Sequence, residues 1–130
     1  MKYMLLMQHN SKSWESFGEW SKEDIRVMVE FMDRLNDELV KTGEWVGADG
    51  LGGPRFAKIV HAGKDGEAVV TDGPFPEAKE FLAGFWTVDV ATPERAIELA
   101  ARVSSCPGAG GQPGNTPVEV HPVMDGPPID

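Results

Sequence analysis

The segment Ser21 to Gly43, SKEDIRVMVEFMDRLNDELVKTG, has the features of one long helix. The Ser21 hydroxyl can accept from the first unpaired backbone N–H groups, and acidic residues follow it where the helix dipole favours negative charge. Apolar residues then recur at spacings of three and four, at Ile25, Met28, Met32, Leu35 and Leu39. Gly43 is a typical helix stop. The pattern predicts a helix that buries one face in a core.

Short apolar segments on both sides of this helix predict strands. Lys2 to Gln8 (KYMLLMQ) is apolar on both faces, so we expect a strand with both faces covered. The polar and aromatic segment Asn10 to Trp20 and the turn-rich segment Glu44 to Pro54 are expected to be loops. Further strands are expected at Phe56 to Ala62, Glu67 to Thr71, Phe85 to Val90 and Val118 to Val123, the first two forming a hairpin.

A second helix is predicted to begin at Thr92. Its hydroxyl can cap the helix, and Pro93 suits the first helical position. Ala96, Ile97, Ala100 and Ala101 are expected to form its buried stripe. The segment Ser104 to Pro117 is rich in glycine and proline and predicts a loop.

The element order is strand, helix, hairpin, strand, helix, strand. It predicts an α+β fold, a ferredoxin-like βαββαβ unit with an extra strand from the hairpin. We expect one domain over residues 1–124 and a loose tail over 125–130. Two helices can cover only one face of such a sheet, so a second copy is expected on the other face. The alternative is that the hairpin folds back over that face within a monomer.

Composition excludes several kinds of partner. The chain has 130 residues, a net charge of −9 and a pI of about 4.7. Clustered Lys and Arg are needed to bind nucleic acid or an anionic membrane, so neither partner is expected. One cysteine, Cys106, rules out an internal disulfide and suits a reducing compartment. The apolar start, Met1 to Met7, is too short for a signal peptide, so we expect a cytoplasmic protein.

The stretch Thr71 to Trp86, TDGPFPEAKEFLAGFW, resembles the signature of the DGPF branch of the YCII-related proteins. The opening Lys2 to Leu6 and the closing Val118 to Pro122 resemble the same family, with His121 at a position that is often arginine. The resemblance implies a dimeric α/β-barrel or ferredoxin-like fold. It therefore agrees with the element order.

The resemblance implies less about activity. Members of the wider YCII-related group carry a proposed His/Asp pair on and after the first long helix, and some are linked to lyase-type or dehydrochlorinase chemistry. A rough alignment from Gly43 places Met32 and Lys41 at these two positions, and neither can do this acid–base work. Genes of the DGPF branch often lie beside extracytoplasmic-type sigma factors, which implies a functional link to a sigma factor.

Titratable residues at predicted strand ends form the candidate site. His9 and Asp72 are the acid–base candidates, and the ligand-binding candidates are Arg55, Lys79, Glu80 and Trp86. Arg55 and Lys79 could hold a small acidic molecule. In the structural alternative, Asp72 caps its own turn, His9 lies on the surface, and the tryptophans pack in the core.

Three histidines without metal-ligand spacing and the absence of a nucleotide fingerprint predict no metal and no cofactor. We therefore expect a non-catalytic homodimer that binds a small ligand or acts as a regulatory or accessory protein. The alternative is a small-molecule lyase or hydrolase that uses Asp72 and His9 for acid–base chemistry.

Overall fold

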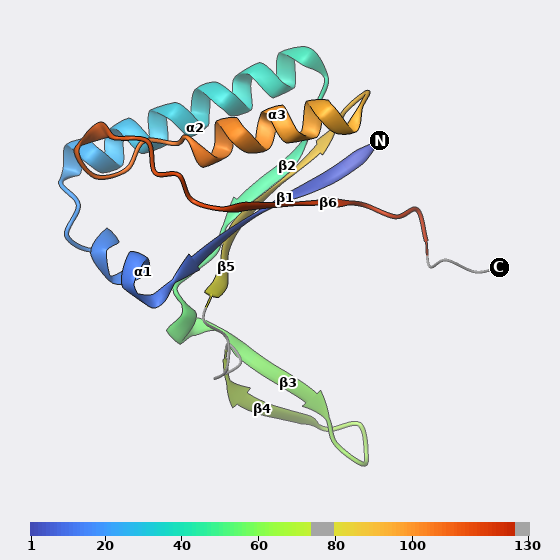
Figure 1. Ribbon diagram of the computed structural model, residues 1–130. Coiled ribbons are helices and arrows are strands. Elements are labelled where there is room, and N and C mark those ends of the chain that lie inside the picture. The colour runs from blue at the N-terminus through green and yellow to red at the C-terminus, as the bar shows by residue number, and fades with distance from the viewer. Residues whose placement is uncertain (74–79, 127–130) are drawn as a thin grey trace.

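A four-stranded antiparallel sheet forms the centre of the computed structural model, which describes residues 1–73 and 80–126 (Figure 1). Its strand order is β2-β5-β1-β6, with β1 at Lys2–Asn10, β2 at Trp45–Gly50, β5 at Glu80–Asp89 and β6 at Val118–Pro122. All neighbours are antiparallel. This arrangement confirms the predicted α+β class and is compatible with a ferredoxin-like fold.

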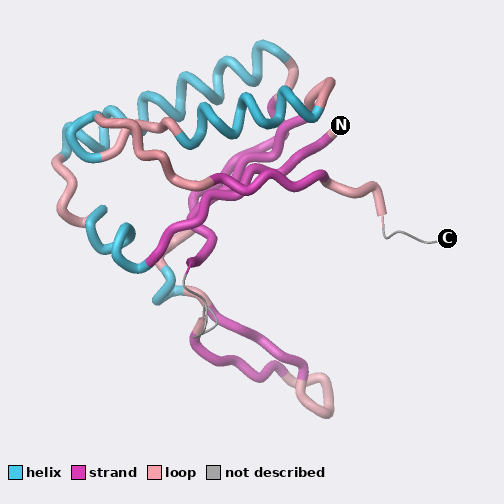
Figure 2. Tube along the Cα trace, viewed as in Figure 1, coloured by secondary structure: helices cyan, strands magenta, loops and turns pink. Residues whose placement is uncertain are grey.

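Two helices cover one face of this sheet (Figures 1 and 2). The first, α2, spans Lys22–Thr42, and the second, α3, spans Pro93–Ser104. The Ser21 side chain accepts from the backbone N–H of Asp24, and Gly43 ends α2 with a left-handed φ of 79°. Both ends of the long helix are therefore confirmed, and the start of α3 at Thr92 is confirmed in the same way.

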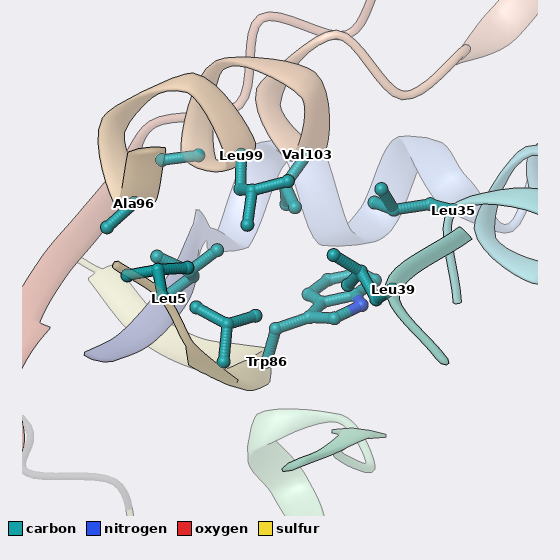
Figure 3. Close-up of a cluster of buried hydrophobic side chains, with 10 residues drawn as sticks. Leu5, Leu35, Leu39, Trp86, Ala96, Leu99 and Val103 are labelled. Atoms are coloured by element: carbon teal, nitrogen blue, oxygen red, sulfur yellow. The ribbon is translucent and has the colours of Figure 1, made fainter. Parts of the chain in front are cut away.

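The core lies between the sheet and these helices (Figure 3). Its buried hydrophobic residues are Leu5, Leu35, Leu39, Trp86, Val88, Val90, Ala96, Leu99, Ala100 and Val103. The predicted stripe of α3 was partly wrong, because Ile97 is 61% exposed, Ala101 is also exposed, and the buried face runs through Leu99 and Val103 instead. Leu99 is three residues after Ala96 and Val103 is four residues after Leu99, so the three side chains share one face of the helix. Ile97 directly follows Ala96 and is therefore rotated by about 100° away from that face.

Two segments that were predicted as loops contain regular structure. The helix α1 spans Ser11–Phe17 because Asn10 and Ser13 form a reciprocal capping box at its start. The strand β2 lies within the segment that was expected to be turn-rich, and it pairs with β5. An added side-chain carbon at Gly84 would lie 3.0 Å from the Asp49 carbonyl oxygen, so glycine permits this close pairing of the strands.

The predicted hairpin is confirmed as β3, Lys58–Ala62, and β4, Ala68–Asp72. A short 3-10 helix, Pro54–Phe56, leads into it. The two strands form a sheet of their own and project away from the helices (Figure 1). The predicted turn that follows Asp72 lies outside the described residues from position 74 to 79, as does the end of the predicted tail, 127–130.

The face of the main sheet opposite the helices carries apolar side chains. Leu5 and Trp86 are buried beneath the helices, so their strand neighbours Leu6 and Phe85 lie on the opposite face, where they are cross-strand partners. Both are only partly buried. The hairpin does not cover them within one chain, since nearly all of its own strand residues are exposed.

Across residues 1–73 and 80–126, no helix combines the length and apolar character that a membrane crossing requires.

Candidate ligand-binding site

A cavity of about 490 Å³ lies where β1 ends. Its walls come from Met7–Asn10, from α1, from Met28 of α2 and from most of the loop 106–117. A cavity of this size is in the usual range for small-molecule sites. It is lined by polar side chains as well as by the aromatic rings of Phe17 and Trp20.

Aromatic packing holds α1 against the sheet. The ring of Trp14 meets that of Phe81 on β5 edge to face, with 5.8 Å between centroids. Trp14 also stacks on Phe17 at 6.1 Å, and Phe17 contacts Trp20 at 4.8 Å. These contacts fix the side of α1 that supplies Ser13, Ser16 and Phe17 to the cavity.

The loop 106–117 forms the opposite wall and is ordered by its own hydrogen bonds. The Gly108 N–H donates to the Gln112 carbonyl at 2.7 Å, and the Gly114 N–H donates to the Cys106 carbonyl at 3.0 Å. The Gly110 N–H donates to the Asp24 carboxylate at 3.1 Å and so attaches the loop to the first turn of α2. The loop therefore forms one wall of the cavity, although Gly110 and Asp24 are 86 positions apart in the sequence.

His9 is the central titratable group of the cavity. Its Nδ1 lies 3.2 Å from the Ser13 hydroxyl, and burial lowers the pKa of the imidazole below its ordinary value. His9 is therefore neutral at pH 7. Cys106 also lines the cavity, and burial raises the pKa of its thiol to about 11, so the thiol stays protonated.

Glu80 reaches the same cavity from β5, where it pairs with Asn10 across the strands. Its side chain is exposed, which places it at the rim. The structure thus brings His9 and Glu80, two of the residues predicted from sequence, to one site. Among residues 1–73 and 80–126, no group of three or more His, Cys, Asp or Glu is arranged to hold a metal ion.

The other predicted site residues lie elsewhere. Asp72 is at the end of the hairpin, 87% exposed, and accepts from the Lys58 ammonium at 2.6 Å. That contact lowers the pKa of the Asp72 carboxyl. Arg55 lies over the Phe56 ring at 4.6 Å. Trp86 is 5% exposed in the core, and its indole N–H donates to Asn36 at 2.8 Å.

Lys79 lies outside the described residues. Asp72, Arg55 and Trp86 are not among the residues that line the cavity.

Sequence reasoning missed several lining residues. Ser13 and Ser16 fell in a segment expected to be a loop, although the spacing Asn10-x-x-Ser13 is a capping signal that could have indicated α1. Cys106, the single cysteine of the sequence, indicated only that no internal disulfide can form. No local signal points to the loop 106–117 as a cavity wall, because its position depends on contacts with Asp24 and Trp20 far away in the sequence.

A smaller cavity of about 350 Å³ lies beside the 3-10 helix. Its lining, which includes Leu51, Pro54, Phe56 and Phe81, carries no ionisable side chain among the described residues. It therefore offers burial but no charged group, so we take the cavity beside His9 as the candidate site.

Comparison with known proteins gives the chain a place among its relatives. The YCII-related domain matches residues 1–109. The chain is also 30% identical over 104 residues to an uncharacterized protein from Rhizobium meliloti (strain 1021), a match that covers 80% of this chain and 79% of that relative.

Proposed function

This chain belongs to the YCII-related family, and from that premise we propose that it is a homodimer that binds a small molecule in the cavity beside His9. Its role is accessory or regulatory rather than catalytic. A functional link to a sigma factor and membership of the DGPF branch stay predictions from the resemblance.

The single observation that carries this proposal is the surroundings of His9. Of the described residues that line the cavity, the ionisable ones are His9, Glu80 and Cys106. The hydrogen bond recorded for the imidazole goes to the Ser13 hydroxyl rather than to a carboxylate. Acid–base catalysis needs positioned partners within hydrogen-bond reach, so this arrangement supports binding more than turnover.

The positions aligned with the family's proposed His/Asp pair support the same view. Met32 packs against the hydrophobic core, and Lys41 is exposed near the end of α2. Neither side chain is an imidazole or a carboxylate, so the family's proposed pair is absent at these two positions.

The open face of the sheet supports the homodimer. Leu6 and Phe85 form an apolar cross-strand pair that the helices do not cover, and both are only partly buried. A stable interface hides about 800 Å² on each partner, which a sheet-to-sheet contact can provide. A second copy would bury the same face of its own sheet.

Sedimentation velocity tests the dimer with a matched pair of variants. We expect a dimer for the wild type, a monomer for Leu6→Asp, and a dimer for Ile97→Asp, since Ile97 is 61% exposed on α3 in the helical layer. Circular dichroism checks that each variant is folded. A monomeric wild type, or a dimeric Leu6→Asp, would contradict the proposed interface.

The alternative function is a lyase or hydrolase in which His9 acts as a general base. The observation that favours it is the lowered pKa of His9, which keeps the imidazole unprotonated at neutral pH. In that case Glu80, rather than Asp72, is the carboxylate that lines the same cavity.

Ligand-induced thermal stabilisation tests the proposed function. A panel of small molecules is screened against the wild type, against Met28→Trp, which places an indole in the cavity, and against Val29→Trp on the adjacent exposed position. We expect stabilising compounds to lose their effect in Met28→Trp and keep it in Val29→Trp. A ligand at 100 times its Kd adds about 2.7 kcal/mol to stability. A panel without any stabilising compound, or equal effects on both variants, would count against the site.

A further inference from the structure

The Ser13 hydroxyl lies within hydrogen-bond reach of His9 and of the Asn10 backbone. It accepts from the Asn10 N–H at 3.2 Å as part of the capping box, and it donates to the Asn10 carbonyl at 3.1 Å. A hydroxyl has one proton, so it has none left for His9. With the hydroxyl proton assigned to the Asn10 carbonyl, the His9 Nδ1, 3.2 Å away, carries a proton and donates to Ser13, which leaves Nε2 as a hydrogen-bond acceptor.

The loop 106–117 has few N–H groups to offer a ligand. Three of its lining residues, Pro107, Pro113 and Pro117, have no N–H. Six other amides of this loop already donate within the protein, those of Cys106, Gly108, Gly110, Gly111, Gln112 and Gly114. The amides of Ala109, Asn115 and Thr116 remain, together with loop carbonyls that can each accept a second hydrogen bond and the side chains of Gln112, Asn115 and Thr116.

The charges around the cavity favour a cationic ligand. Glu80 supplies a carboxylate at the rim, and no Lys or Arg occurs among the described lining residues. The whole chain carries a net charge of −9, which favours the approach of cations. The rings of Phe17 and Trp20 add aromatic faces, which attract an ammonium group electrostatically.

Resting on the proposed function, we propose that the cavity takes a small amine, held as an ammonium ion by His9 Nε2 and the Glu80 carboxylate. Ser13 is the positioning residue that keeps His9 in the accepting tautomer. This differs from the acidic ligand expected from the sequence, because Arg55 is not among the lining residues and Lys79 lies outside the described residues.

Three probes of one shape test the ligand class by isothermal titration calorimetry. Benzylamine is cationic at neutral pH, benzyl alcohol is neutral and benzoate is anionic. We expect benzylamine to bind at least tenfold more tightly than benzyl alcohol, and benzoate not to bind. In Glu80→Gln we expect benzylamine to lose at least fivefold in affinity while benzyl alcohol is unchanged.

The outcomes separate this inference from the proposed function. Tighter binding of benzoate than of benzylamine would overturn the amine preference while leaving the cavity a binding site. An unchanged benzylamine affinity in Glu80→Gln would also overturn it. Failure of all three probes to bind would contradict the proposed function together with the inference.

Nitrogen-15 NMR of the imidazole tests Ser13 without any ligand. We expect wild-type His9 to show a protonated Nδ1 and an unprotonated Nε2. Ser13→Ala should give a mixture of tautomers and a benzylamine affinity at least threefold weaker, and Ser13→Thr should restore both. Glu15→Gln is the matched control, because Glu15 lies on the same helix, is exposed and is not among the lining residues. A wild-type imidazole protonated on Nε2 would overturn the assignment.

Discussion

Replacing Gly53 by alanine should displace Trp14 and loosen α1 from the sheet. A side-chain carbon at position 53 would lie 2.8 Å from the Trp14 Nε1 and 2.9 Å from two of its ring carbons. The backbone itself tolerates alanine, because Gly53 has a φ of −58° and a ψ of 161°. The effect of the substitution therefore comes from the contact with Trp14.

The size of the effect follows from this geometry. Ordinary contacts begin near 3.4 Å, so the indole must move by roughly half an ångström or more. Overfilling a packed site costs about 1–3 kcal/mol, and the loss of glycine freedom in the unfolded chain offsets about 0.4–1 kcal/mol. We expect Gly53→Ala to lower the free energy of unfolding by about 1–2 kcal/mol.

Urea denaturation followed by tryptophan fluorescence measures this change, and near-ultraviolet circular dichroism reports the environment of Trp14. Gly52→Ala is the matched control, because its added carbon would meet Phe56 at an ordinary 3.7 Å. We expect the control to be as stable as the wild type or slightly more stable. If Gly53→Ala is as stable as Gly52→Ala and keeps the wild-type dichroism, the packing of α1 described above is wrong.

Three further predictions concern charge. Glu44→Gln should lower stability at pH 7 by about 1 kcal/mol, because it removes a carboxylate that accepts from two Arg95 nitrogens at 2.9 and 3.0 Å. Urea titration should show this difference vanish as pH falls through the lowered pKa of Glu44, below 4.5. Asp72→Asn should change neither thermal stability nor benzylamine affinity, because the Asp72 carboxylate is 87% exposed and forms its ion pair with Lys58 outside the cavity. Burial lowers the pKa of His9 below 6.5, so below pH 6.5 the unfolded chain binds the proton more readily than the folded chain. The wild type should therefore lose stability relative to His9→Gln between pH 6.5 and 5, with a constant difference from pH 7 to 8; a constant difference over the whole range would contradict the burial of His9.

The long helix could be predicted because its signals are local. The cap at Ser21, the acidic first turn, the apolar stripe and the stop at Gly43 all lie within one segment, and the structure agrees with the cap, the first turn and the stop. Of the stripe, Leu35 and Leu39 are buried and Met28 and Met32 are partly buried, whereas Ile25 was wrongly predicted and is 36% exposed. The hairpin at β3 and β4 could be predicted for the same reason, since a short glycine-containing turn joins two β-branched runs.

The strand β2 could not be predicted because its own sequence, WVGADG, favours turns. It becomes a strand through its pairing with β5, which glycine at position 84 allows. The short helix α1 was missed because seven residues carry too little periodic pattern, although its capping box was present. Contacts between distant segments decided both outcomes.

The candidate site was predictable in part. His9 was chosen as a titratable residue at the end of a predicted strand, and Glu80 as a charged residue in the segment after Asp72. The pairing of β1 with β5 brings both to one cavity. Asp72 had the same local features, yet the hairpin carries it away from the cavity to an ion pair with Lys58. The wall made by the loop 106–117 depends on the bond between Gly110 and Asp24, and residues so far apart show no joint pattern in one sequence.

The most direct test of the account is a titration of the nitrogen-15-labelled protein with benzylamine, followed by two-dimensional NMR. Binding beside His9 predicts saturable shifts at His9, at the Trp20 indole and along the loop 106–117, with little change in the hairpin. Shifts confined to the hairpin or to the open face of the sheet, or no saturable shifts at all, would contradict a ligand site at this cavity.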